Sequence, residues 1–119
     1  MSGAKTLKQN SEFHRAYGRG KVKASPCLVT YAVKNRGLGC RTGITAAKKL
    51  GSAVERNRCR RIIRAAFSSI SNECCGNWDI VFVARFKTKK AKSTDLTPIM
   101  RTHLTELGVI KSRAEADSL

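Results

Sequence analysis

Acidic residues are scarce in this sequence: Asp and Glu total 8 among 119 residues, against 24 Lys and Arg. No cluster of carboxylates suited to two-metal phosphodiester cleavage is visible. The only two histidines, His14 and His103, stand far apart in the chain and have no obvious pairing. We therefore predict that the chain holds no catalytic residue and no metal ion of its own.

Long apolar runs are also missing, since no segment approaches the roughly 20 residues that span a bilayer. Residues 1–10 lack the apolar centre of a signal peptide. The cysteines are odd in number and have neither CxxC spacing nor a histidine pair beside them; they are Cys27, Cys40, Cys59, Cys74 and Cys75. These absences predict a reduced cytoplasmic chain that uses cysteine as a small apolar residue and has no membrane partner.

The excess of basic residues gives a formal net charge of +16. So much repulsion opposes folding unless a polyanion neutralises it, which favours nucleic acid over an acidic protein or a membrane surface. The apolar fraction of 41% is ordinary for a folded protein, and the length fits one domain. We expect a single domain over residues 1–119, with frayed ends at 1–9 and 109–119.

The N-terminal half carries signals for one helix and two strands. Helix-starting residues at 10–12 precede apolar positions at helical spacing, and Gly18 and Gly20 follow them. Residues 27–33 are rich in β-branched side chains and predict a strand, with residues 41–47 as its hairpin partner.

Stronger signals follow in the C-terminal half. Ser52 and Glu55 form a capping box, which predicts a helix from there to about residue 71. Residues 80–84 predict a buried strand, and the apolar stripe that follows ends at Gly108, a typical helix stop. The order helix, strands, helix, strand, helix (αβββαβα) predicts an α+β fold, a single-domain α/β sandwich.

The helix that begins at Ser52 has two chemically distinct faces. At about 100° per residue, one arc is apolar and should face the sheet; it contains Cys59, Ile62, Ile63, Ala66, Phe67 and Ile70. A second arc on the far side is polar and basic; it contains Asn57, Arg60, Arg61 and Arg64. No acidic residue follows Glu55 in this helix, so the arginines have no helical ion-pair partners. Arginine forks match phosphate oxygens, which favours nucleic-acid contact over a merely solvated face.

Residues 43–64, GITAAKKLGSAVERNRCRRIIR, resemble the motif of the bacterial ribonuclease P protein family. That family carries G-[apolar]-x-x-x-K-K-x-G-x-A-V-x-R-N-x-x-[KR]-R-x-x-R. The resemblance covers about residues 7–107 and implies a left-handed βαβ crossover. It also implies a subunit of an endoribonuclease in which a catalytic RNA, with its Mg²⁺ ions, removes the 5′ leader of precursor tRNA. The protein would bind the leader, raise substrate and magnesium affinity, and pair 1:1 with the RNA.

The resemblance also assigns roles to residues. The positions expected to contact the catalytic RNA are Lys48, Lys49, Arg56, Asn57, Arg58 and Arg61. Those expected to line a cleft for the leader are Phe13, Tyr17, Tyr31, Arg60 and Arg64. Aromatic faces and arginines suit a leader of variable sequence. For the three aromatic residues, plain core packing stays open as the alternative.

A second basic run follows the last strand, and its lysines are Lys87, Lys89, Lys90 and Lys92. It is either a further RNA contact or a solvated loop. Two other functions stay open for the whole chain. A ribosomal or other structural RNA-binding protein fits the charge equally well, and an autonomous basic nuclease would cleave RNA unaided.

Overall fold

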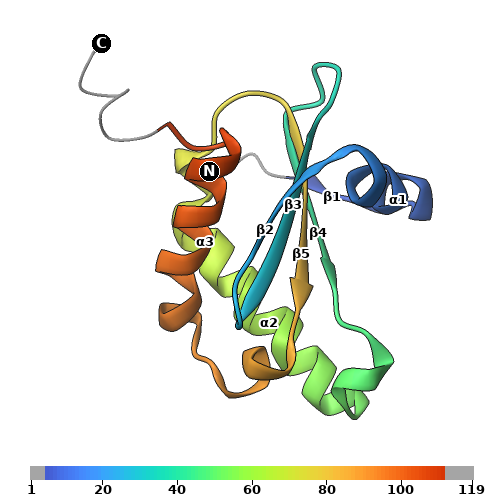
Figure 1. The fold of residues 1–119 in the computed structure, drawn as a ribbon, viewed down its shortest axis with the longest axis vertical. Helices are drawn as coiled ribbons and strands as arrows, with labels where there is room; N and C mark the ends of the chain where they lie inside the picture. Colours follow the sequence, from blue (N-terminus) through green and yellow to red (C-terminus); the bar gives the residue numbers. More distant parts are fainter. Residues whose placement is uncertain (1–4, 112–119) are drawn as a thin grey trace.

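A computed structural model describes residues 5–111 of the chain. Three helices pack on one five-stranded mixed sheet (Figure 1). In chain order the elements are β1 (Lys5–Thr6), α1 (Asn10–Arg19), β2 (Lys21–Ala24), β3 (Leu28–Lys34), β4 (Cys40–Thr45), α2 (Ala53–Ile70), β5 (Trp78–Ala84) and α3 (Ser93–Leu107). Three short 3₁₀ turns join them: η1 (Lys48–Leu50), η2 (Ser71–Glu73) and η3 (Phe86–Lys90). The α+β sandwich predicted from the sequence is confirmed, with β1 as an added strand.

The strands lie in the order β1-β4-β5-β3-β2. The predicted hairpin between residues 27–33 and 41–47 is wrong, because β5 lies between β3 and β4. β5 is apolar along most of its length and is buried on both faces, so it takes the centre of the sheet. The hairpin partner of β3 is β2 instead.

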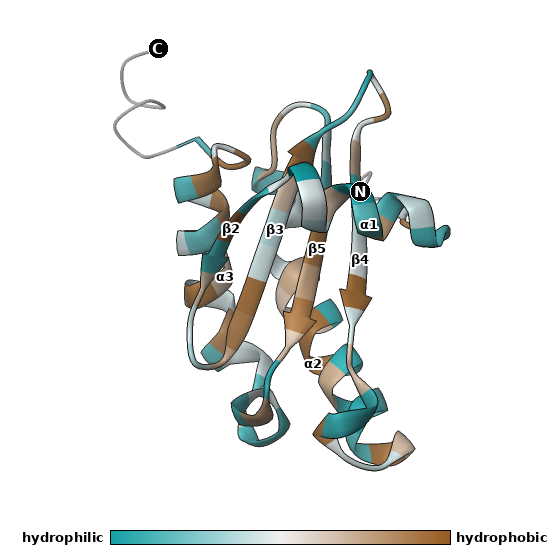
Figure 2. Ribbon diagram, turned by 45° about the vertical axis from the view of Figure 1, so that its right-hand side comes forward, coloured by the Kyte–Doolittle hydropathy of each residue, from teal (hydrophilic) through white to brown (hydrophobic). Residues whose placement is uncertain are grey.

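The connection from β4 through α2 to β5 joins two parallel neighbours. In Figure 2 both strands run downward with β5 to the left of β4, and α2 crosses behind the sheet. The crossover is therefore left-handed, as the family resemblance implies, whereas nearly all such connections are right-handed.

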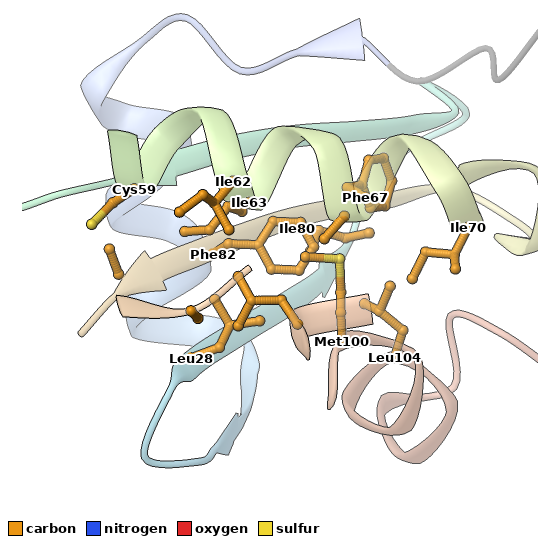
Figure 3. Close-up of a cluster of buried hydrophobic side chains, with 14 of the residues drawn as sticks. Leu28, Cys59, Ile62, Ile63, Phe67, Ile70, Ile80, Phe82, Met100 and Leu104 are labelled. Carbon is orange, nitrogen blue, oxygen red and sulfur yellow. The ribbon is translucent and has the colours of Figure 1, made fainter. Parts of the chain in front are cut away.

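The main core lies between the sheet and the helices α2 and α3 (Figure 3). All six residues of the predicted apolar arc of α2 are buried in it. A smaller core forms on the other face of the sheet, where α1 packs; its fully buried members are Leu7, Ala16 and Val81. The helices α2 and α3 thus cover one face of the sheet, and α1 covers the other.

Both ends of the described chain are held by burial. Leu7, Val109 and Ile110 are buried, and β1 pairs with β4, although these positions fall in the ranges 1–9 and 109–119 that are expected to fray. Within those ranges, residues 1–4 and 112–119 lie outside the described residues. Among the described residues, no helix combines the length and apolarity needed to cross a membrane.

Candidate nucleic-acid interface

An open cleft runs between α1, the end of β4 and α2. A hollow of about 310 Å³ is lined by Phe13 and Tyr17 from α1 and by Arg60 from α2. An adjoining hollow of about 160 Å³ shares Phe13 and Arg60 and adds Arg64. Four of the five residues predicted for the leader cleft therefore meet in one place.

The fifth residue, Tyr31, lies beneath this cleft. Its ring packs edge to face with Tyr17 at 5.0 Å, and it is half-buried against the small core. The Tyr17 hydroxyl lies 2.6 Å from Thr45 Oγ1, and 37% of the Tyr17 residue is exposed. Tyr31 thus supports Tyr17 from below, so the packing alternative fits Tyr31 best and Tyr17 least.

Phe13 owes its position to a glycine on the neighbouring strand. A Cβ atom on Gly43 would lie only 2.5 Å from Phe13 Cζ, so no larger residue fits beneath the ring. Phe13 is half-buried there and still lines both hollows. The glycine that opens the family motif therefore sets the floor of the cleft.

An ion-pair network attaches α1 to the sheet. Asp79 is 1% exposed and accepts hydrogen bonds from Arg41 at 2.8 and 2.7 Å and from Asn35 at 2.8 Å. Arg41 also donates to Glu12 at 2.6 Å, and Arg15 lies 3.7 Å from Asp79. Burial alone raises the pKa of Asp79, but the Arg41 and Asn35 hydrogen bonds and the arginine charges outweigh it and hold that pKa below its ordinary value.

The arginines of α2 divide between its two sides. Arg60 and Arg64 border the cleft, and Arg60 donates to Asn57 Oδ1 at 2.9 Å. Arg58 and Arg61 lie instead beside a separate hollow of about 270 Å³ at the start of α3, where Lys92 joins them. One helix thus presents two basic surfaces, the first with aromatic side chains and the second without.

Arg56 is half-buried on α2, and its Nε is a buried donor without a hydrogen-bond partner among the described residues. A buried unpaired donor costs free energy, and this nitrogen is itself covered by the protein. The RNA contact of Arg56 stays a prediction.

The lysines of the basic runs have different surroundings. Lys89 Nζ donates to the Leu50 carbonyl at 2.6 Å and lies 3.3 Å from Glu55, so it ties η3 to the start of α2. Arg58 adds a bond to the Lys89 carbonyl at 3.1 Å. The remaining lysines of these runs are exposed; they are Lys48, Lys49, Lys87, Lys90 and Lys92. Lys89 has a structural role, and the other lysines stay predicted RNA contacts.

Sequence reasoning missed Gly43 and the network of Asp79, Arg41 and Glu12. Both depend on partners distant in the sequence, so no local pattern reveals them. The sequence offers one signal for such a partner, since Asp79 is a lone acid that opens a buried strand in a very basic chain. Within residues 5–111, no group of three His, Cys, Asp or Glu residues lies close enough to hold a metal ion.

The fold and the cleft define a class of protein: a small basic α+β domain with a left-handed crossover and an arginine-rich helix beside an aromatic-lined groove. The ribonuclease P family model matches residues 1–108. The chain therefore belongs to the ribonuclease P protein family.

Individual relatives agree with this assignment. The chain is 41% identical over 93 residues to the ribonuclease P protein component of Clostridioides difficile (strain 630), which covers 77% of this chain and 82% of that protein. It is 31% identical over 104 residues to the ribonuclease P protein component of Clostridium botulinum (strain Loch Maree / Type A3). That match covers 87% of this chain and 94% of the relative.

Solved structures agree as well. The RNase P protein of Staphylococcus aureus superposes with a TM-score of 0.77 at 30% identity, covering 89% of this chain and 97% of that one. The RNase P protein of Thermotoga maritima shares the fold and superposes with a TM-score of 0.73 at 23% identity. That match covers 91% of this chain and 99% of the other. Membership of this family gives the chain its role in ribonuclease P and tRNA processing.

Proposed function

We propose that this protein assists the catalytic RNA of ribonuclease P by holding the 5′ leader of precursor tRNA in the α1–β4–α2 cleft. The observation that carries the proposal is the division of the arginines of α2. Arg60 and Arg64 face the aromatic cleft, whereas Arg58 and Arg61 face away from it. One helix thereby serves two RNAs, the leader on one side and the catalytic RNA on the other.

The chemistry of the cleft suits a single strand of variable sequence. Bases stack on aromatic faces whatever their identity, at roughly 1–3 kcal/mol per base, and arginines bind the phosphates between them. Tyr17 and Phe13 supply the faces, and Arg60 and Arg64 supply the charges. We assign the contacts with the catalytic RNA to six residues outside the cleft, which are Lys48, Lys49, Arg56, Asn57, Arg58 and Arg61.

Catalysis belongs to the RNA in this proposal. Mg²⁺ would be bound through the RNA, and the protein would pair 1:1 with that RNA in the cytoplasm. The protein would raise the apparent affinity for magnesium by neutralising RNA phosphates that repel one another. An autonomous nuclease would need acid–base or metal-binding groups in the cleft, whose lining offers one exposed histidine, His14, and no carboxylate.

Reconstitution tests the proposal. Adding the protein to its cognate catalytic RNA at low Mg²⁺ should restore cleavage of precursor tRNA, whereas the protein alone should cleave nothing. Unchanged turnover and unchanged substrate affinity would contradict the proposal, as would cleavage by the RNA-free protein.

A pair of double variants separates the two basic surfaces. Arg60→Ala with Arg64→Ala should weaken precursor binding by the holoenzyme more than mature-tRNA binding, with a salt dependence lowered by about 0.7 per lost phosphate contact on a single strand. Arg58→Ala with Arg61→Ala is the matched control, since it removes the same charge and should weaken binding of the catalytic RNA instead. Equal losses on precursor and mature tRNA in the first variant would remove these two arginines from a leader site.

A further inference from the structure

Four arginines line a further hollow, of about 350 Å³, on the far side of α1 from the cleft. Arg15 and Arg19 come from α1, Arg36 from the turn between β3 and β4, and Arg41 from β4. In Figure 1 this turn projects beyond the end of the sheet on which α1 packs. We call Arg15, Arg19, Arg36 and the space between them the arginine pocket.

Charge in the arginine pocket is not balanced. Arg41 and Arg15 share the carboxylates of Asp79 and Glu12, two positive charges against two negative ones. Arg19 and Arg36 are exposed and make no hydrogen bond or ion pair within residues 5–111. Two guanidinium groups therefore stand beside a neutralised network with their donors free, which is the chemistry that binds phosphate.

The backbone that carries these arginines is held firmly. Asn35 donates to the Gly39 carbonyl at 2.9 Å and accepts from the Leu38 amide at 2.9 Å, which closes the turn around Arg36. Arg15 donates to the Lys34 carbonyl at 2.7 Å and joins α1 to the end of β3. Little backbone ordering would accompany binding, so the pocket is preorganised for a ligand.

The two sides of α1 differ in chemistry. Phe13 and Tyr17 are four residues apart and share the face that lines the cleft. Arg15 and Arg19 are also four apart and are offset from them by two positions, about 160° around the helix axis. A strand that leaves the cleft across α1 therefore passes from an aromatic face to an arginine face.

We propose that the arginine pocket binds phosphates of the upstream part of the precursor leader, beyond the nucleotides held in the cleft. The inference rests on the proposed function. The leader is favoured over the catalytic RNA because the pocket shares α1 with the cleft, whereas Arg58 and Arg61 lie on α2, across the sheet. The exposed Leu38 side chain, 49% accessible, borders the pocket and offers an apolar surface to a base or ribose.

The test compares precursors with a short leader, which ends within the cleft, and with a long one. The holoenzyme is reconstituted with wild-type protein or with the double variant Arg19→Ala, Arg36→Ala, which removes no hydrogen bond or ion pair within residues 5–111. The control variant is Lys23→Ala with Lys111→Ala, which removes equal charge; Lys23 pairs with Glu106 of α3, and Lys111 follows α3. Dissociation constants are measured over a series of salt concentrations.

The wild type and the control should bind the long leader more tightly than the short one. In the arginine variant the ratio of long-leader to short-leader affinity should fall by roughly tenfold. The slope of log affinity against log salt concentration should be lower by about 1.4 for the long leader, as two lost single-strand phosphate contacts predict. Short-leader binding should not change. An unchanged gain would overturn the inference, and so would an equal loss with both leaders, which would assign the pocket to the catalytic RNA.

Failure of this inference is distinguishable from failure of the proposed function. The cleft variant, Arg60→Ala with Arg64→Ala, should weaken binding of short and long leaders alike. If it does so while the arginine variant behaves like the wild type, the leader site in the cleft is supported and the phosphate site in the arginine pocket is contradicted.

Discussion

Gly43 is the residue on which the position of the Phe13 ring depends, because a Cβ atom would lie 2.5 Å from Phe13 Cζ and 3.3 Å from Leu7 Cβ. We expect Gly43→Ala to push the ring out of the cleft and to destabilise the fold by about 1–3 kcal/mol, the usual cost of overpacking. Urea unfolding measures the loss of stability. The ratio of precursor to mature-tRNA affinity, which should fall, measures the effect on the cleft.

Gly18 provides the matched control for this prediction. It lies in the same helix as Phe13, and a Cβ atom there would meet nothing within 4 Å. Gly18→Ala should leave the affinity ratio unchanged and, if anything, raise stability by roughly 0.5–1 kcal/mol, since alanine favours helix. A neutral Gly43→Ala variant would show that Phe13 does not need this close approach.

His103 makes stability depend on pH. It is buried, its Nδ1 lies 2.9 Å from Thr30 Oγ1, and Glu106 and Lys23 are the charged groups near it. Burial lowers the pKa of His103 below its ordinary value of about 6.5, so the unfolded chain takes up a proton before the folded one does. The free energy of unfolding should therefore fall as the pH drops below about 6.5, with a slope of at most about 1.4 kcal/mol per pH unit from this group.

Urea unfolding between about pH 5 and 8 checks this prediction, because that range brackets the ordinary histidine pKa of about 6.5. His103→Gln should flatten the dependence on pH, although it lowers stability overall. His14→Gln changes an exposed histidine of α1 and should keep the wild-type slope. A His103 variant with an unchanged slope would assign the pH dependence to other groups.

At the scale of elements, α1 is joined to the sheet by a small core and by the Asp79 network. Asp79→Ala would leave Arg41, whose side chain is 19% exposed, without its main partner. We expect a loss of about 3 kcal/mol in unfolding free energy, as for other buried ion pairs broken on one side. Because α1 carries Phe13 and Tyr17, precursor affinity should fall as well.

The control for Asp79 is the exposed ion pair of Glu73 and Arg101, which joins η2 to α3 at 3.0 Å. Glu73→Gln should change stability by less than about 1 kcal/mol, as exposed pairs generally do. If both variants lost the same small amount, the Asp79 network would not be what holds α1 in place.

The helices were predictable because their signals are local. The capping box of Ser52 and Glu55 and the stop at Gly108 lie within a few residues of the helix ends that they define. The order of the strands was not predictable in this way, because strand pairing joins residues as far apart in the sequence as Leu28 and Ala84. That pairing follows from the burial of β5 on both faces.

In the site, too, local features were predictable from the sequence and long-range contacts were not. The angular positions on α2 placed Arg60 and Arg64 correctly relative to the core, because helical geometry needs no partner. The fit of Phe13 over Gly43 and the meeting of Arg36 with Arg19 depend on how separate elements pack. Nothing in the neighbouring residues of the sequence encodes either one.

For the whole molecule, the short strand β1 has a consequence for solubility. β1 pairs with β4 only at Arg41 and Thr42, so within the described residues the rest of that sheet edge has no strand partner. An uncovered edge invites pairing with another chain, and natural proteins often guard such edges with charge. Here the open edge lies beside Arg60 and Arg64, whose charges repel a second copy of this strongly basic protein. We therefore expect the positive charges that attract RNA also to disfavour pairing of two copies through β4, and to do so less as salt screens them.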